Sequence, residues 1–551
     1  MSEEFFDVVV VGSGFGGAVT ACRVAEAGRK VLVLERGKLY QPGEFPRSPL
    51  EMSTNFWDPS EGLFGLFQIW SFRHLDAVVS SGVGGGSLVY ANVMLRMPQM
   101  WFDASAQDWP LEYSDIEEHY GTVEKMMGAE PFPPNMHRRV PKAAVFEDVA
   151  RKAGMSPQPA PLAVTFAENG QHPGDPFAAP EDNLHRFQRR TCRLCGECDL
   201  GCNDGAKNTL DFTYLSQAQR CGAEIRPLHE VKRITAIDEG YELDYVVHRP
   251  AQPPWERVRR SPGEQPAFQR VRATTVVVAA GALGSTWLLL VNRPGLPYLS
   301  GQLGTRFSGN GDAIGFLPEG RDIAESPRGP VTTEYAQHED RAYYLQDGGY
   351  PAILGWLGES VRPALSARAR RLLLRRWWEH LRGHPHSSTD SDVSAKVAAV
   401  LGSARCSRST LPLLAMGLDP AQGTMRLTDG RLDFAWPTEE SREYVRDFRR
   451  LSRQWGLWKT MTTRGKASDS RFREVVSSLL SRNITAYPLG GCPMGKNAAY
   501  GVVDRHGEAF GHPGLFVADG SVLPAPVGAN PSLTIAALAE RFANRIVERS
   551  R

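Results

Sequence analysis

The sequence has no excess of either charge and no long hydrophobic run. With 63 basic and 62 acidic side chains its formal net charge is +1, which offers no general attraction to nucleic acid. No apolar run reaches the ~20 residues that a membrane-spanning helix needs, and no secretory leader precedes the first apolar segment. We find no internal repeat. We therefore expect a cytoplasmic globular protein whose 551 residues form at least two domains.

Cysteine is scarce, and half of the eight cysteines fall in one short stretch. Cys192, Cys195, Cys198 and Cys202 are spaced C-x2-C-x2-C-x3-C. Bacterial ferredoxins ligate iron–sulfur clusters with this spacing, although their fourth Cys serves a second cluster and is followed by proline. A disulfide framework is not expected in the cytoplasm. The pattern leaves four readings open, which are a [4Fe–4S] cluster, a three-iron cluster with fewer ligands, a zinc site and reduced thiols that brace a turn.

The N-terminus carries a dinucleotide-binding pattern. A β-branched run, residues 6–12, leads into G-x-G-x-x-G at Gly12, Gly14 and Gly17, and a helical pattern and a second strand follow, ending at Glu35. Glycines let the backbone approach a pyrophosphate, the helix N-terminus stabilises its charge, and the acid bonds a ribose hydroxyl. The complete strand–loop–helix–strand–Glu unit is much more specific than the glycines alone.

Two further stretches have the composition of cofactor-facing loops. Residues 80–92, SSGVGGGSLVYAN, are too rich in glycine for a helix or strand interior. Near the C-terminus, an apolar run ends at Asp519-Gly520, and a helix pattern begins after Asn530-Pro531. A helix N-terminus of this kind suits an anionic or electron-rich ligand.

The order of these patterns predicts a fold that combines α/β and α+β parts. We expect a dinucleotide-binding Rossmann-like domain with a parallel sheet, and a second, substrate domain built on an antiparallel sheet. The dinucleotide-binding domain is assigned residues 1–100, 191–310 and 476–551, with 101–190 as a connecting, substrate-facing part and 311–475 as the substrate domain. The substrate domain contains a basic stretch, residues 362–388, in which Leu372–Leu374, Trp377 and Trp378 are interleaved. This pattern is typical of a surface helix with a solvated basic face, or of a helix that lies at a membrane interface. We therefore expect membrane contact to be peripheral at most.

Taken together, these motifs resemble the glucose–methanol–choline (GMC) oxidoreductases, and most closely their cholesterol-oxidase-like bacterial branch. The resemblance rests on GSGFGG with Glu35, GVGGGSLVYAN, GAKNTL, AAGALGST and the closing PLGG…VADGS…GANPSLTIAALAER, and it covers essentially the whole chain. It implies a flavoprotein that passes hydride from an alcohol CH–OH to flavin N5. For this branch it also implies a bulky apolar substrate of sterol or terpenoid type, and a role in steroid metabolism.

The resemblance also implies roles for particular residues. It assigns the ADP half of FAD to Gly12, Gly14, Gly17 and Glu35. The other residues that it places against FAD are Val231, Gly84, Gly85, Ser87, Asn92, Asp519, Gly520 and Asn530.

This sequence departs from the family pattern at the catalytic position. Where the sterol oxidases have a His before P-L-G-G, Tyr487 stands here, and their catalytic Glu falls near Gln346 or Asp347. We expect Tyr487 and Asn530 to position the hydroxyl while Asp347 or an ordered water accepts its proton. Tyrosine is a poor base at neutral pH, so a desaturation or a decarboxylation is an alternative. A third reading is a flavin and iron–sulfur electron carrier. Oxygen or a redox partner protein would be the electron acceptor.

Overall fold

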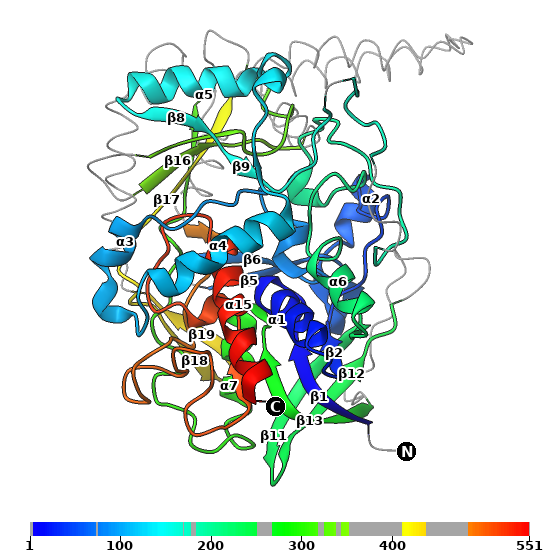
Figure 1. Ribbon diagram of the computed structural model, residues 1–551, viewed down its shortest axis with the longest axis vertical. Coiled ribbons are helices and arrows are strands. Elements are labelled where there is room, and N and C mark those ends of the chain that lie inside the picture. Colours follow the sequence, from blue (N-terminus) through cyan, green and yellow to red (C-terminus); the bar gives the residue numbers. More distant parts are fainter. Residues whose placement is uncertain are drawn as a thin grey trace, which may run out of the picture.

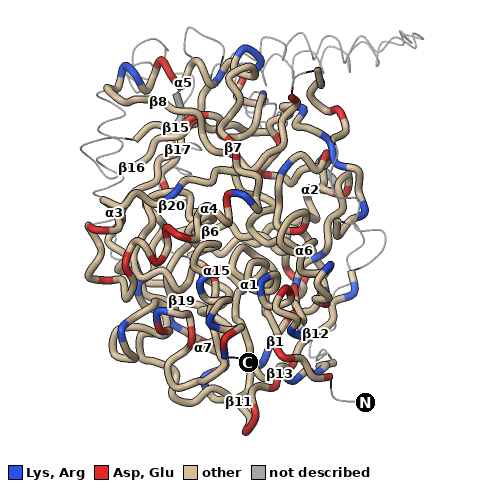
Figure 2. The backbone as a smooth tube through the Cα atoms, viewed as in Figure 1, with Lys and Arg blue, Asp and Glu red and all other residues tan. Residues whose placement is uncertain are grey.

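The structure is a computed structural model that describes residues 4–72, 75–168, 170–177, 183–250, 267–317, 324–337, 343–351, 410–436 and 483–549. A large mixed sheet lies at one end of the long axis, and an antiparallel sheet with one covering helix lies at the other (Figure 1). Basic and acidic side chains are interspersed along the described chain (Figure 2), as the balanced composition predicts. No helix among these residues is long and apolar enough to cross a membrane.

The larger sheet has seven strands in the order β10-β2-β1-β13-β12-β11, with β21 paired to β13. Its strands are β1 (Glu4–Val11), β2 (Val31–Leu34), β10 (Glu224–Arg226), β11 (His229–Ile237), β12 (Gly240–Val247), β13 (Phe268–Val278) and β21 (Leu515–Val517). The first half of β13 pairs with β12 and its second half with β21, so three distant parts of the chain meet there. The β1, β2, β10 and β21 pairings are parallel, and the valines at 8–10 of β1 and 276–278 of β13 are 0% exposed.

Helices cover one face of this sheet. Helix α1 (Phe15–Glu26) packs on β1 and β2, and α15 (Ser532–Arg549) lies beside it (Figure 1). Helix α4 (Ser114–Met127) packs against α15, and α6 (Tyr214–Arg220) packs against α1. Helix α7 (Gly281–Val291) follows β13 directly. The α15 helix begins just after Asn530-Pro531, which confirms the helix start expected there.

The second sheet is antiparallel and has the order β14-β17-β16-β15-β8. Its strands are β8 (Ser156–Pro159), β14 (Ala313–Leu317), β15 (Glu334–Gln337), β16 (Tyr343–Asp347) and β17 (Leu411–Gly417). Helix α5 (Pro141–Lys152) covers one face, where Phe146 packs with Tyr343 and Leu345. Alternate residues of a strand point to opposite faces, so Tyr344 and Gln346 face the nucleotide-binding part instead. The expected fold class is confirmed.

Smaller elements complete the described chain. A three-stranded sheet joins β5 (Phe67–Ser71), β6 (Leu75–Ser80) and β20 (Asn483–Thr485), and β18 (Thr424–Thr428) pairs with β19 (Arg431–Ala435). The short elements are α2 (Pro49–Ser53), β3 (Trp57–Asp58), η1 (Pro59–Glu61), β4 (Leu63–Phe64), η2 (Gly85–Leu88), α3 (Gln99–Ala104), η3 (Ala106–Asp108), β7 (Glu130–Pro131), η4 (Pro134–Arg139), β9 (Pro161–Leu162), η5 (Cys198–Leu200) and η6 (Gly520–Val522). The basic stretch 362–388 lies outside the described residues.

Candidate active site

The glycine loop between β1 and α1 is shaped by close backbone contacts. Gly12 has φ +99°, and a Cβ there would lie 2.4 Å from the Ala279 oxygen, while a Cβ on Gly17 would lie 2.2 Å from the Gly12 oxygen. A Cβ on Gly14 would meet nothing within 4 Å. Gly14 is also the N-cap of α1 and has no side chain to cap it, so the first backbone N–H groups of the helix remain available to an anion.

Ser13 joins this loop to the second glycine-rich loop. Its hydroxyl donates to Glu35 Oε2 at 2.7 Å and accepts from the Gly84 N–H at 3.1 Å. Glu35 also accepts from the Gly37 N–H at 2.8 Å, and it is 6% exposed at the end of β2. A Cβ on Gly85 would lie 2.6 Å from the Gly14 Cα, so the two loops are in direct contact. The residues assigned to the two halves of FAD therefore form one continuous surface.

Behind this surface lies an amide with no partner. Asn92 has φ +69°, is fully buried, and neither its Oδ1 nor its Nδ2 has a hydrogen-bond partner. Buried polar groups in native proteins are nearly always bonded, so an unpaired amide points to a missing ligand contact. Ser87, by contrast, is used internally, because its hydroxyl donates to the Gly84 oxygen and accepts from the Leu210 N–H.

The C-terminal wall is held by Asp519. Its Oδ2 accepts from the Gly281 N–H at 2.8 Å and from the Ser285 hydroxyl, and its Oδ1 caps η6 at Ser521. Burial raises the pKa of Asp519. Gly520 next to it accepts from the Gly490 N–H at 2.9 Å, which ties the 519–522 turn to the loop that carries Tyr487.

The residue Val231, assigned to the adenine, lies on β11 and is 5% exposed. The pairing of β11 with β12 is irregular between Val231 and Arg233. A bulge at this point opens the strand backbone next to β2, with which β11 is in contact. An FAD molecule fits the cradle formed by these loops, given the open side of Gly14, the uncapped α1 N-terminus and the unpaired Asn92 amide.

Tyr487, Asn530 and Gln346 meet at the junction of the two sheets. Gln346 Nε2 donates to Asn530 Oδ1 at 2.6 Å, and both residues are almost fully buried. The Asn530 side chain lies beside the Tyr487 hydroxyl. Asn530 Oδ1 accepts from Gln346, and the Asn530 Nδ2 is the donor that this amide offers to the phenol oxygen. Burial, followed by the charge of Asp312, raises the pKa of Tyr487, so the phenol stays protonated.

A carboxyl that the sequence did not single out faces Tyr487. Asp312 Oδ2 accepts from the Thr485 hydroxyl at 2.7 Å and from the Ala486 N–H at 3.2 Å, whereas its Oδ1 is buried without a partner. Burial, aided by the charge of the neighbouring Asp419, raises the pKa of Asp312 to about 8. The Thr485 hydroxyl in turn accepts from the Tyr487 N–H at 3.0 Å.

Asn310, two residues before Asp312, fixes the other side of the site. Its Oδ1 accepts from the Val527 and Gly528 N–H groups, and its Nδ2 donates to the Ala529 oxygen at 2.8 Å. It thus clamps the backbone directly before Asn530. The one sequence signal for both residues was the glycine turn SGNGD ahead of an apolar strand.

Asp347 occupies a different place from the one that the sequence predicted. Successive residues of β16 point to opposite faces, so Gln346 faces Asn530 and Asp347 faces α5. Both oxygens of Asp347 are used there: Lys142 Nζ lies 2.6 Å from Oδ2, and Thr333 donates from its N–H and hydroxyl. Both members of the ion pair are 0% exposed. This position argues against the proton-accepting role, because the carboxylate faces away from Tyr487 and is fully bonded.

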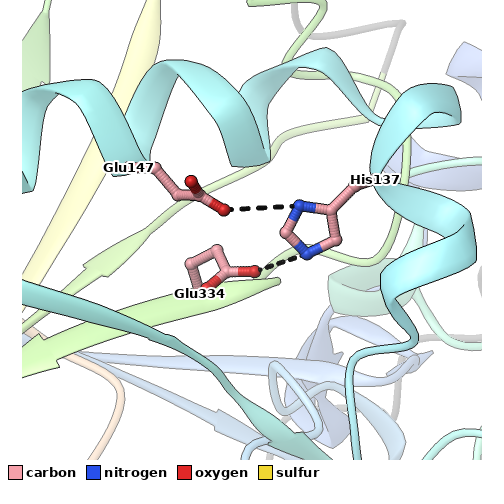
Figure 3. Close-up of side chains that lie close together, drawn as sticks. All are labelled: His137, Glu147 and Glu334. Carbon is pink, nitrogen blue, oxygen red and sulfur yellow. Dashed lines mark ion pairs between the residues drawn. The ribbon is translucent and has the colours of Figure 1, made fainter.

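The same face of the sheet holds a second group of charged side chains. His137, on η4, points one ring nitrogen at Glu147 of α5 (3.4 Å) and the other at Glu334 of β15 (2.9 Å) (Figure 3). Burial and the nearby Asp347 raise the pKa of Glu334 to about 8. Since each carboxylate meets a different ring nitrogen, the imidazole clamps α5 to the sheet and does not converge with both acids on one metal position.

The cysteine loop lies against the second glycine loop. Lys207 Nζ donates to the Leu88 and Cys198 oxygens, both at 3.0 Å, and lies 4.7 Å from the Tyr90 ring centroid. Burial lowers the pKa of Lys207 to about 8. Asp199, on η5, has its pKa raised to about 6 by burial, and its charge acts on Tyr487. The cysteine loop therefore borders the site, a position that spacing alone did not indicate.

Comparison with known proteins identifies the family of the chain. Two family models described as GMC oxidoreductase match residues 7–297 and 422–539. A cholesterol oxidase of Acinetobacter baumannii is 28% identical, with 97% of this chain and 93% of that protein covered. A cholesterol oxidase of Mycobacterium tuberculosis (strain ATCC 25618 / H37Rv) is also 28% identical, with 98% and 90% covered. The long-chain-alcohol oxidase FAO4B of Arabidopsis thaliana is 26% identical, over 98% of this chain and 67% of its own.

Solved structures share the fold. Pyridoxine 4-oxidase from Mesorbium loti has a TM-score of 0.58 at 16% identity, with 98% of this chain and 99% of that chain covered. A fungal aryl-alcohol oxidase has a TM-score of 0.55 at 16% identity, with both chains fully covered. GMC oxidoreductases bind FAD, and the cradle described above accommodates that group. The chain therefore belongs to the GMC oxidoreductase family and is an oxidoreductase that acts on CH–OH donors.

Proposed function

We propose that the protein oxidises the CH–OH group of a bulky apolar alcohol of sterol or terpenoid type. The names of its relatives, cholesterol and long-chain-alcohol oxidases, support an apolar alcohol. So does the face of β16 that carries Gln346, because Tyr344 lies on the same face and its ring is 4.8 Å from that of Trp101. Aromatic side chains of this size favour rigid apolar ligands, with a few polar groups to orient them.

The observation that carries the proposal is the orientation of the Gln346–Asn530–Tyr487 chain. Gln346 donates to Asn530 Oδ1 at 2.6 Å, and this orientation directs the Asn530 amide nitrogen to the Tyr487 oxygen beside it. The Tyr487 O–H is then free to donate to the oxygen of a substrate. Tyr487 thus acts as a hydrogen-bond donor that orients the hydroxyl, and a different group accepts the proton.

We assign Asp312 as the group that accepts the proton of the substrate hydroxyl. A general base works best when its pKa is close to the working pH, and the pKa of Asp312 is raised to about 8 by burial. Its unpaired Oδ1 has no competing donor in the described chain. Asp347 has no such capacity, since Lys142 and Thr333 occupy its oxygens.

FAD supplies the hydride acceptor when bound. Gly12, Gly14, Gly17 and Glu35 would hold its ADP half, and Val231 would lie near the adenine. Gly84, Gly85, Ser87 and Asn92 would line one side of the flavin half and Asp519, Gly520 and Asn530 the other. The residues of the chain hold the alcohol, exclude water and take the hydroxyl proton, so that a C=O bond forms as the hydride departs.

The test is anaerobic flavin reduction. Purified protein is mixed with a 3-hydroxysteroid, a terpenoid alcohol, a long-chain alcohol and ethanol, and flavin bleaching is followed. We expect the bulky apolar alcohols to bleach the flavin and ethanol to fail. Tyr487→Phe should slow bleaching by about tenfold, the cost of one lost hydrogen bond to the reacting oxygen. Bleaching by ethanol alone, or by none of the alcohols, would refute the proposal. Reduction only by a carbonyl compound would favour desaturation.

A further inference from the structure

The four clustered cysteines have no role in the alcohol chemistry. Cys192, Cys195, Cys198 and Cys202 are all free thiols, so no disulfide explains their proximity. Cys192 is buried, and the other three are partly exposed. Free thiols pack as small apolar groups, and packing alone does not require four of them in eleven residues.

A backbone N–H group points at one of these sulfurs. The Leu194 N–H donates to Cys192 Sγ at 3.4 Å, in a turn that places Leu194 at φ +63°. Gly196, the residue after Cys195, also has a positive φ, +70°. A neutral thiol is a weak acceptor, whereas N–H bonds to metal-bound thiolates are a regular feature of iron–sulfur sites.

The sulfurs are not grouped as a single metal ion would need. In the described chain, the trio of ligand atoms within 4.8 Å of one another is His137, Glu147 and Glu334, and no three cysteine sulfurs approach so closely. Four thiolates around one zinc would lie about 3.8 Å apart, given Zn–S bonds of ~2.3 Å. A cluster, in which each sulfur binds a different iron, spaces its ligands more widely.

A buried cation without a carboxylate partner lies beside the loop. Lys207 is 2% exposed, and within the described residues no carboxylate oxygen lies within ion-pair distance of its Nζ. Its two partners there are the carbonyls of Leu88 and Cys198. A buried ammonium is costly unless it is paired. Asp199 and Asp211 act on Lys207 from beyond ion-pair distance, and a thiolate-ligated cluster would add negative charge directly beside it.

The loop is also rigidly braced. Arg47 pairs with Glu197 at 2.7 Å and donates to the Gly201 oxygen at 2.7 Å. A Cβ on Gly196 would lie 2.2 Å from the Pro327 oxygen, and one on Gly201 would lie 2.1 Å from the Phe45 ring. The backbone that presents the sulfurs is therefore fixed from both sides.

We propose that Cys192, Cys195, Cys198 and Cys202 ligate a [4Fe–4S] cluster that carries electrons from the flavin to an external acceptor. η5 packs against η2, and Lys207 bridges the two loops, so the cluster lies beside the loop assigned to the flavin. This electron route rests on the proposed oxidation of an alcohol by the flavin. Each alcohol oxidised delivers two electrons to the flavin, and these leave one at a time through the cluster. They reduce two molecules of a one-electron acceptor, such as a cytochrome or ferredoxin-like protein, and two protons are released.

The cluster is tested without any substrate. Protein purified anaerobically, and reconstituted with iron and sulfide, is analysed for both elements and by electron paramagnetic resonance after dithionite reduction. We expect about four irons and four sulfides per chain and a signal from the reduced cluster. Cys195→Ser should lose the signal and most of the iron, while Cys221→Ser, a free cysteine outside the loop, should keep both. Protein with native near-ultraviolet dichroism that holds no iron, or one zinc, would overturn the proposal.

The electron route is tested separately. With a reducing alcohol and ferricenium as acceptor, Cys195→Ser should lower turnover at least tenfold, while its anaerobic flavin reduction by the alcohol stays at the wild-type rate. Lys207→Met should lower the cluster's reduction equilibrium constant at least tenfold, about 59 mV for one electron, because a balancing positive charge is lost. Unchanged ferricenium turnover in an iron-free Cys195→Ser enzyme would refute the route. An iron-loaded protein that no alcohol reduces would refute the alcohol proposal and leave the cluster intact.

Discussion

The assignment of Asp312 as the proton acceptor predicts a particular pH profile. A base works in its ionised form, so the rate of anaerobic flavin reduction should rise with pH and level off above about 8, the raised pKa of Asp312. At pH 6, two units below that value, about 1% of the carboxyl is ionised, and the rate should be about 100-fold below its plateau. Among the described residues, the titratable groups that face Asp312 are Asp419, in the loop after β17, and Tyr487.

The assay is stopped-flow reduction of the flavin by saturating alcohol between pH 5.5 and 9.5. Asp312→Asn should remove the rising limb and leave a low, flat rate. Asp419→Asn is the matched control: it removes a nearby negative charge, so it should lower the pKa of Asp312 and move the limb to lower pH. If Asp312→Asn keeps a limb at pH 8, Asp312 only positions the Thr485–Tyr487 loop, and the reasoning fails.

Three further changes follow from the contacts. Lys142→Met leaves a buried carboxylate unpaired and should destabilise the protein by about 3–5 kcal/mol, seen as a lower thermal midpoint, while flavin reduction in the folded fraction is unchanged. Gln346→Leu frees the Asn530 amide to turn, and should slow flavin reduction by about tenfold with the midpoint little changed, which stopped-flow kinetics checks. Gly17→Ala puts a Cβ 2.2 Å from the Gly12 oxygen and should impair folding. Gly14→Ala should fold, because its Cβ meets nothing within 4 Å, but should bind FAD at least tenfold more weakly in an equilibrium titration. An unchanged FAD affinity would contradict the anion site at the α1 N-terminus.

The sequence by itself determined the cofactor domain. Strand, glycine loop, helix, strand and Glu35 are contiguous, and each piece obeys a local rule, so β1, α1 and β2 appear where the residues predict them. The start of α15 after Asn530-Pro531 is equally local, because proline and the apolar period fix it within a few residues. Residues 423–436 fall in the segment assigned to the antiparallel substrate domain, but β18 and β19 form a separate hairpin.

Only the tertiary structure decided which side chains meet. Gln346 and Asp347 are neighbours in sequence, yet the pleat of β16 sends one to Asn530 and the other to Lys142, more than 180 positions from one partner and more than 200 from the other. Asp312 reaches Tyr487 because β14 and the end of β20 lie side by side. The register of distant strands sets these contacts, and no local pattern encodes that register. For the same reason the sequence did not predict that the cysteine loop lies beside the glycine loop assigned to the flavin, although it did show the spacing of the four thiols.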